Sequence, residues 1–445
     1  MPSTHRGPMT LSLRTALVLA CVLPASGALA QTTAAPAAAA RAIPAAPHPS
    51  LASLSSPTGR GPYSAQAMLQ APFMAGARLF ALDASGALTV RDNNGRGAPH
   101  EVLPPVAGGY AAIAPSPNGR YVAYTTADST HTFGDVRVRD VANGHDLPDV
   151  LHAARVSRAP WTHNESGFFY VREEAPGGRQ RIYFHSLGRA EASDAVIFSQ
   201  FDQPTWSYDA RVSDDGEYAV FTVGHPADNH TRVFFIDMTD AEHPTLDAPV
   251  VRLANTFDSH YEFVDNAGTY FFLQTDRDAP RGRVVLANTN VTRETGWPSV
   301  VPQSEDTLVY ARTAGDQYVI PVYRVNGHLT ARVLGPPDPT VVRAEMRARI
   351  DSIRKEREKD RNDNRRSDRG PFMMRDVSPI RLQAVRDVDL PDGASILAMN
   401  TIADKPTVYF VARMPDGSLR TYAYDVTNGS AATSAPVTAT AAASR

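Results

Sequence analysis

The sequence predicts an all-β fold, a seven-bladed β-propeller, from a turn-and-strand pattern that recurs at a long and nearly fixed period. In each copy a polar turn ends at a glycine and leads into a short strand rich in aromatic side chains. Four clear copies, 48, 49 and 52 residues apart in succession, end their turns at Gly119, Gly167, Gly216 and Gly268. A period of about 40–50 residues with several short strands per unit is typical of propeller blades.

The copy at 159–170 shows the chemistry of the repeat most clearly, because it reads APWTHNESGFFY. Glycine supplies backbone angles that other residues avoid, and asparagine and serine side chains hydrogen-bond a turning backbone. Aromatic side chains suit a pleated and packed surface. We therefore expect a tight turn that closes at Gly167 and a buried strand directly after it.

Three weaker copies, at 74–80, 305–310 and 403–410, bring the total to seven. Each copy is followed by a second strand with its own turn, such as Asn93-Asn94-Gly95 in the first repeat. Aspartates recur at the ends of these second strands, at Asp140, Asp237 and Asp425, which favours turn capping over acid–base chemistry. A β-sandwich is the alternative, but sandwiches give a turn every 8–12 residues without a long period.

The two ends of the chain read differently from the repeats. Residues 1–30 are typical of a secretion signal, with an apolar core at 15–23 and a small-x-small cleavage sequence that ends at Ala30. A lipoprotein cut before Cys21 is the alternative. We expect an Ala/Pro-rich disordered linker at 31–70, the propeller at 71–429 and a low-complexity, disordered tail at 430–445.

Composition excludes several classes of function. The formal charge of −3 gives no nucleic-acid footprint, and no later segment is long and apolar enough for a membrane span. Cys21 is the only cysteine, so a cleaved chain would have no disulfide, thiolate metal site or cysteine nucleophile. His225 and His230 flank Asp228, but spacing fixes no third metal ligand, and histidines of a solvated turn are the expected reading. We expect no metal and no cofactor.

A charged segment interrupts the repeats between the sixth and seventh blades. From 343 to 369 it holds eleven Lys/Arg and seven Asp/Glu, with a weak helical stripe of apolar residues only as far as Ile353. We expect a short charged helical insertion at 340–372. Because charges of both signs alternate, a solvated insertion is favoured over a docking arm for an acidic partner.

Several motifs resemble the prolyl oligopeptidase family of serine peptidases, in its N-terminal propeller domain. They occur in order over about 75–300 and read VRDVANGHDLPDVL from Val138, WTH before GFFY from Trp161, PTW and SDDGEY from Pro204 and Ser213, and TDRDAP from Thr275. The resemblance implies a seven-bladed propeller that, in the family, covers an α/β-hydrolase domain with a Ser-Asp-His triad and admits only short peptides.

The residues that carry the family's chemistry are absent from this sequence. An α/β-hydrolase nucleophile needs a G-x-S-x-G turn, and the nearest approach, Gly393-Ala394-Ser395, has Leu at 397. The acid and tryptophan that the family commonly places before the second blade's inner strand are replaced by Ser129-Thr130-His131-Thr132-Phe133. We therefore assign no catalytic, cofactor-binding or metal-binding residues and expect no activity from the chain alone.

Two functions fit these observations, and a third is weaker. The favoured one is a non-catalytic module of the bacterial periplasm that binds a peptide or protein ligand at the propeller mouth. The alternative is one half of a split serine-type oligopeptidase, whose α/β-hydrolase is supplied by a separate chain. The weaker idea is an envelope scaffold that docks through 343–369. The sequence leaves the ligand and the oligomeric state open.

Overall fold

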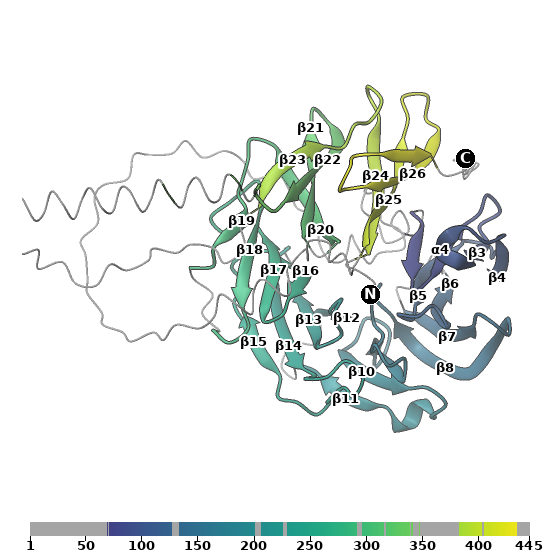
Figure 1. Ribbon diagram of the computed structural model, residues 1–445. Helices are drawn as coiled ribbons and strands as arrows, with labels where there is room; N and C mark the ends of the chain where they lie inside the picture. The colour runs from purple at the N-terminus through teal and green to yellow at the C-terminus, as the bar shows by residue number, and fades with distance from the viewer. Residues whose placement is uncertain are drawn as a thin grey trace, which may run out of the picture.

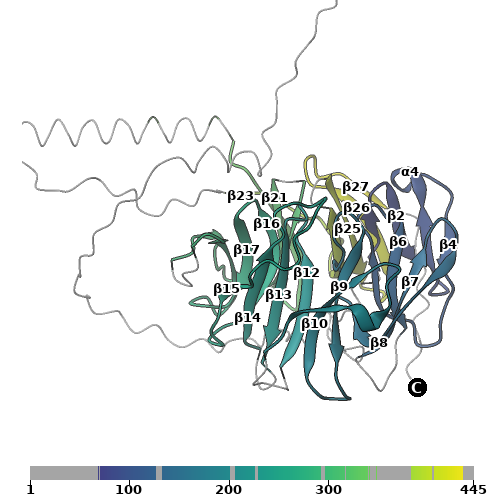
Figure 2. The ribbon, with the colours of Figure 1, turned by 90° about the horizontal axis from the view of Figure 1, so that it is seen from below.

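The computed structural model describes residue 69 and residues 71–433, apart from 127–132, 201–205, 226–228, 292–295, 316, 339, 341–346, 348–381 and 403–404. The predicted signal, nearly all of the linker, most of the tail and the 129–132 segment lie outside these residues. Small antiparallel sheets follow one another around a common centre (Figure 1), and their strands run alongside each other when the ring is turned (Figure 2). The all-β propeller class is therefore confirmed.

The strands pair into six sheets. The first sheet contains β1 (Phe73–Ala75), β2 (Arg78–Leu82), β3 (Leu88–Arg91) and β4 (His100–Leu103). A seven-stranded sheet follows, with β5 (Tyr110–Pro115), β6 (Tyr121–Thr126), β7 (Gly134–Asp140), β8 (His145–Arg155), β9 (Gly167–Glu173), β10 (Gln180–Ser186) and β11 (Ala195–Phe198).

Four further sheets have four strands each. They contain β12 (Ser207–Val212), β13 (Tyr218–Gly224), β14 (Thr231–Asp237) and β15 (Val251–Ala254), and then β16 (Tyr261–Ala267), β17 (Tyr270–Thr275), β18 (Arg283–Asn288) and β19 (Ser299–Val301). The last two contain β20 (Thr307–Ala314), β21 (Tyr318–Val325), β22 (His328–Gly335) and β23 (Gln383–Asp387), and then β24 (Ser395–Ile402), β25 (Lys405–Arg413), β26 (Leu419–Asp425) and β27 (Ala431–Thr433).

The prediction of seven separate blades with a helical insertion is wrong. Five four-stranded blades stand apart, while the strands of the second and third repeats form one continuous sheet. The eleven-residue β8 is long enough for Ala154 and Arg155 to pair with β9, which joins the two repeats. The helical elements whose bounds the structure describes are only α4 (Asp92–Gly95) and the 3-10 turn η1 (Glu191–Ser193). The expected insertion at 340–372 lies outside the described residues apart from isolated positions.

The predicted turn chemistry holds in detail. Asp140 Oδ1 accepts the backbone N–H groups of Ala142 and Asn143 at 2.9 and 3.0 Å, and Asp425 Oδ1 accepts that of Thr427 at 2.8 Å. These aspartates cap turns, as their position predicted. The element α4 is itself a tight turn, since Asn93 and Asn94 adopt left-handed φ values of 54° and 53°.

Gly167 differs from the other glycines of the repeat. Gly119 and Gly216 have φ of +69° and +77°, as a turn-closing glycine needs, but the left-handed residue of the 159–170 turn is Glu165 at +55°. Gly167 instead begins β9, opposite Ser186. A Cβ there would lie 2.1 Å from the carbonyl oxygen of His185, so this position requires glycine for space rather than for backbone angles.

Replacing Gly167 with alanine is therefore expected to destabilise the protein by about 1–3 kcal/mol or more, because backbone atoms must move to admit the methyl group. Gly134→Ala in β7 is the matched control. Its Cβ would meet only the Thr125 Cγ2 methyl at 3.3 Å, so its cost should stay within about 1 kcal/mol. Urea denaturation of both variants measures the difference, and equal midpoints would contradict this account.

Side chains fill the space between neighbouring repeats. Trp161 is 2% exposed and donates its indole N–H to the carbonyl oxygen of Ala114 at 2.8 Å, and its ring packs 4.7 Å from that of Phe168. Between the seven-stranded sheet and the sheet that follows it, the Phe169 and Phe221 rings lie 5.9 Å apart. Such aromatic contacts bury large apolar areas and fix how successive sheets face each other.

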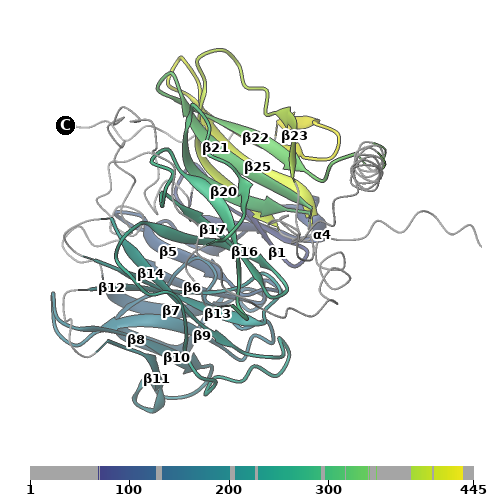
Figure 3. The same ribbon diagram turned by 90° about the vertical axis from the view of Figure 1, so that its left-hand side faces the viewer.

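The ring closes where the first and last strands meet. Asn400 of β24, 2% exposed, donates from Nδ2 to the carbonyl oxygen of Ala71 at 2.7 Å. Lys405 Nζ lies 3.2 Å from the carbonyl oxygen of Gly76. The preceding sheet, which contains β20 and β22, packs on the other side of the last one (Figure 3), where β20 lies beside β24 and β25 and β22 lies beside β24. Non-covalent contacts therefore join the two ends of the described chain.

Candidate functional site

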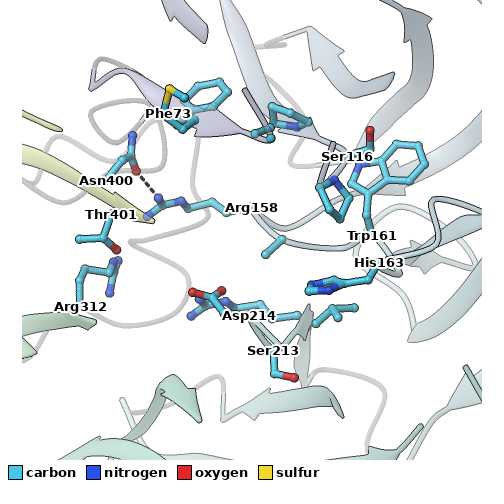
Figure 4. Close-up of a pocket in the computed structure, with 18 of the residues that line it drawn as sticks. Phe73, Ser116, Arg158, Trp161, His163, Ser213, Asp214, Arg312, Asn400 and Thr401 are labelled. Carbon is cyan, nitrogen blue, oxygen red and sulfur yellow. Dashed lines mark hydrogen bonds between the residues drawn. The ribbon is translucent and has the colours of Figure 1, made fainter. Parts of the chain in front are cut away.

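The inner segments of the ring enclose a cavity of about 440 Å³. Its walls come from the whole circumference: β1, the end of β5, the loop before β9, the end of β12, and strands β16, β20 and β24. Figure 4 shows Arg158 extending across this space toward Asn400, with Arg312 and Asp214 on the facing wall. A volume of this size suits a small ligand or a few residues of peptide.

Four cations and one carboxylate are the charged side chains among the described residues that line the cavity. They are Arg158, Arg211, Arg312, Lys405 and Asp214. The wall is therefore electropositive within the described part of the chain. Such a charge balance favours anions inside the cavity, where the surrounding protein weakens screening by water.

Arg158 lies at the centre of this charge. Its guanidinium donates from Nη2 to Asn400 Oδ1 and reaches solvent inside the cavity. The surrounding protein, with added repulsion from Arg312 and Arg211, lowers the pKa of Arg158. Asn400 is held in turn by the carbonyl oxygen of Ala71, so the ring-closing contact also positions this arginine.

The other two arginines are anchored to strands. Arg211 at the end of β12 donates from Nη1 to the carbonyl oxygen of Phe263 at 2.8 Å. Arg312 of β20 places Nη1 3.6 Å from Glu262 Oε1 and 2.8 Å from the carbonyl oxygen of Ala311. Burial lowers the pKa of Arg312, the Glu262 carboxylate opposes that shift and Arg211 adds to it.

The remaining wall is largely apolar. Phe73, Ile113, Trp161 and Val264 line it, with His163 beside Trp161. The His163 ring occupies the space next to Gly216, where a Cβ would lie 2.5 Å from its Cγ. The cavity thus combines an apolar side with a cationic side, which is the usual composition of a site for a small amphipathic ligand.

The serines in the cavity are not arranged as nucleophiles. Ser213 donates its hydroxyl to Asp215 Oδ1 at 2.7 Å and accepts the backbone N–H of Tyr218 at 3.0 Å. Ser116 Oγ accepts the backbone N–H of Tyr121 at 3.0 Å. Both hydroxyls therefore serve the turn of their repeat, and Asp215 Oδ1 also caps the turn at Ser213 by accepting the backbone N–H of Glu217 at 3.1 Å.

A second charged cluster is buried within the seven-stranded sheet. His185 Nε2 lies 2.9 Å from Asp149 Oδ1, and its Nδ1 lies 3.0 Å from both carboxylate oxygens of Asp194. Burial opposes the charged form, but hydrogen bonds to Asp194 and Asp149 outweigh it and raise the pKa of His185. With carboxylates on both ring nitrogens, both nitrogens are donors and His185 is an imidazolium.

The histidines weighed as metal ligands, His225 and His230, lie between β13 and β14. The backbone N–H of His225 donates to the carbonyl oxygen of His230 at 3.1 Å, and the His225 ring packs 5.1 Å from Phe257. In the described residues, no three His, Cys, Asp or Glu side chains group as metal ligands would. Nor does any helix in this part of the chain combine the length and apolarity that a membrane crossing requires.

The arginines of the cavity were missed by sequence reasoning. Arg158 lies in a loop and Arg211 and Arg312 lie on strands of different sheets, so no shared motif marks them. Only closure of the ring brings them together. Asp149 lies in the VRDVANGHDLPDVL motif, but no motif of the sequence marks its partner His185.

The architecture and its central cavity define the chain as a β-propeller. Residues 109–432 match the family described as the prolyl oligopeptidase N-terminal beta-propeller domain, and the chain belongs to this family. It is 26% identical over 217 residues to prolyl oligopeptidase A of Amanita bisporigera, covering 43% of this chain and 28% of that protein. Against the prolyl endopeptidase of Elizabethkingia meningoseptica the identity is 24% over 246 residues, covering 51% and 34%.

Solved structures show the same fold. A structure from a study of two prolyl endopeptidases superposes with a TM-score of 0.63 at 19% identity, over 86% of this chain and 50% of that one. Oligopeptidase B from Leishmania major gives a TM-score of 0.57 at 13% identity, over 82% and 48%. The chain thus spans about a third of the length of the curated relatives and about half that of the solved chains.

Proposed function

We propose that this propeller is a non-catalytic module that binds a peptide or protein ligand, with a short peptide segment entering the central cavity. The main support for this proposal is the cavity. Its lining combines apolar residues, such as Trp161 and Phe73, with the cationic residues Arg158 and Arg312. The family relationship supports a peptide as ligand, because the relatives are named as oligopeptidases and endopeptidases. The hydrogen bonds of Ser116 and Ser213 support the absence of catalysis by this chain.

The proposed location is the bacterial periplasm. It rests on the leader-like composition of residues 1–30, with cleavage near Ala30. Amino-terminal sequencing of the chain recovered from a periplasmic extract is expected to begin at about Gln31. Recovery of the chain in the cytoplasm with Met1 intact would refute this location.

The test of function uses the purified full chain and an N-blocked Gly-Pro p-nitroanilide substrate. We expect release of nitroaniline at the rate of buffer alone, because the described residues hold no preorganised set of nucleophile, base and oxyanion donors. In parallel, calorimetric titration with N-acetyl-Ala-Pro-Ala is expected to show saturable binding. Turnover that follows the protein through a second purification would contradict the non-catalytic role.

The alternative is the propeller half of a split serine-type oligopeptidase, which gates peptide access to a hydrolase on another chain. It is favoured by the names of the relatives, which are peptidases. Affinity capture from the native envelope decides between the two. Recovery of an α/β-hydrolase whose peptidase activity changes on adding the propeller would support the split enzyme.

A further inference from the structure

We propose that the cationic wall of the central cavity binds the carboxylate of a short peptide, with Arg158 and Arg211 as the residues that hold it. The inference rests on the proposed peptide-binding function and names the group on the peptide that the site recognises. It follows from three features of the cavity: unmatched guanidinium groups, a rigid framework that holds them, and an apolar wall beside them.

The first feature is a shortage of carboxylates. In the described part of the chain, neither Arg158 nor Arg211 has a carboxylate oxygen within 4.0 Å. Their hydrogen bonds go instead to neutral oxygens, the Asn400 side chain and the Phe263 backbone. Arg312 has Glu262 at 3.6 Å, which is a long contact for this kind of pair. Guanidinium groups prefer to bind carboxylates through two parallel hydrogen bonds.

The acidic groups nearby do not cancel this charge. Asp214 lines the cavity, Glu262 faces Arg312, and Asp209 is attracted to both Arg155 and Arg211 behind the wall. Lys405 at the rim adds a further cation, although it also binds Gly76 and Asn94. Mutual repulsion between the three arginines, which contributes to the low pKa of Arg158, would be relieved by an anion between them.

The second feature is the framework. Asn400 is buried and fixed by Ala71, so it holds Arg158 in a defined position. The Phe263 carbonyl holds Arg211, and the Phe263 ring lies 5.6 Å from the Arg211 guanidinium carbon. A long side chain that is already ordered loses less entropy when a ligand binds. Such preorganisation is expected of a recognition site.

The third feature is the apolar lining beside the cations. Figure 4 shows Phe73 close to Asn400 and Arg158 and Trp161 across the cavity from them, and Ile113 also lines the cavity. A carboxylate at the arginines would place the adjoining side chain of a peptide near Phe73, the partly exposed ring of this lining, whereas Trp161 is 2% exposed and packs behind it. Inorganic anions would leave this surface unused, which is why a peptide is favoured over a free anion.

The experiment compares four probes by calorimetric titration of the full chain at low salt. The probes are N-acetyl-Ala-Pro-Ala with a free carboxylate, the same peptide as its amide, N-acetyl-Ala-Pro-Glu amide, and inorganic phosphate. We expect the free acid to bind at least about tenfold more tightly than the amide. If the side-chain carboxylate of the glutamate peptide binds equally well, the source is any peptide carboxylate; if it does not, the source is the C-terminus.

Two variants locate the binding site. Arg158→Gln and Arg211→Gln are each expected to abolish the preference for the free acid, while Arg189→Gln, at an exposed turn position, retains it. Arg158→Gln should also keep or raise the melting temperature, because it removes a repelled charge. A melting temperature lowered by many degrees would mark Arg158 as a structural residue and overturn the assignment.

The remaining outcomes separate this inference from the function on which it rests. Equal affinity for the acid and the amide would overturn the carboxylate site and leave peptide binding intact. Phosphate that binds as tightly as the free acid would also overturn it, in favour of a free-anion site. Binding of none of the peptides would overturn both this inference and the proposed function.

Discussion

Replacing His185 with alanine is expected to destabilise the protein by about 3–5 kcal/mol, because it leaves two buried carboxylates without their shared cation. The side chains of His185, Asp149 and Asp194 are 1%, 1% and 2% exposed, so water cannot replace the lost partner. Within the described part of the chain, Asp194 would keep only the hydroxyl of Tyr170, which donates to it at 2.9 Å. Urea denaturation at pH 6 measures the loss.

His152→Ala is the matched control for this substitution. His152 also contacts an aspartate, with Nδ1 2.9 Å from Asp135 Oδ1, but its side chain is 68% exposed. His152→Ala should lower the free energy of unfolding by no more than about 1 kcal/mol, as is typical for contacts between exposed side chains. A His185 variant that loses no more stability than the His152 variant would show that the buried cluster contributes nothing.

The same cluster predicts a pH dependence. The folded-state pKa of His185 is raised above its usual value of about 6.5. The native state therefore binds more protons than the unfolded state between the two pKa values, and stability falls as pH rises there. The stabilisation by His185 is fully present below about pH 6.5 and is lost as pH rises through the folded-state pKa. The wild type should accordingly lose stability on the alkaline side, and the His185→Ala variant should lose less of it.

Replacing Trp161 with alanine is expected to destabilise the protein by about 3–5 kcal/mol as well. The change leaves a cavity between the strands of two repeats, beside Phe168 and Tyr121, whose ring stacks 6.1 Å away. It also leaves the carbonyl oxygen of Ala114 without its indole donor. Thermal denaturation and urea midpoints measure the loss.

Trp161→Phe separates packing from hydrogen bonding at this position. It retains an aromatic ring but cannot donate to Ala114, so a smaller cost of about 1–3 kcal/mol is expected. If the phenylalanine variant were as unstable as the alanine variant, the hydrogen bond rather than ring packing would dominate at this junction between repeats.

The fold class could be predicted because the signal is local. Each repeat carries its turn residues and its aromatic strand within a few positions, as at Ser213 and Tyr218, where the turn serine accepts the first strand N–H. Separation of the blades could not be predicted in the same way. The pairing of Ala154 with Arg172 depends on how far β8 extends, and no turn residue marks that point.

The cluster of arginines in the candidate site could not be predicted from the sequence, for a different reason. Arg158, Arg211 and Arg312 are far apart along the chain and occupy unlike elements, and only the circular arrangement brings their side chains into one space. Gly167 was correctly noticed, but for the wrong reason. Its importance comes from a neighbouring strand that approaches closely, which local turn chemistry does not report.

Contact between Asn400 and Ala71 has a consequence for how the polypeptide acquires its structure in time. The partner of the first sheet is made after all the other described sheets, so an emerging chain exposes two unpaired faces until β24 is made. Arg158 likewise lacks its asparagine during this interval. The central chamber is therefore complete only once β24 has been made, and a ligand cannot be captured before the whole circle exists.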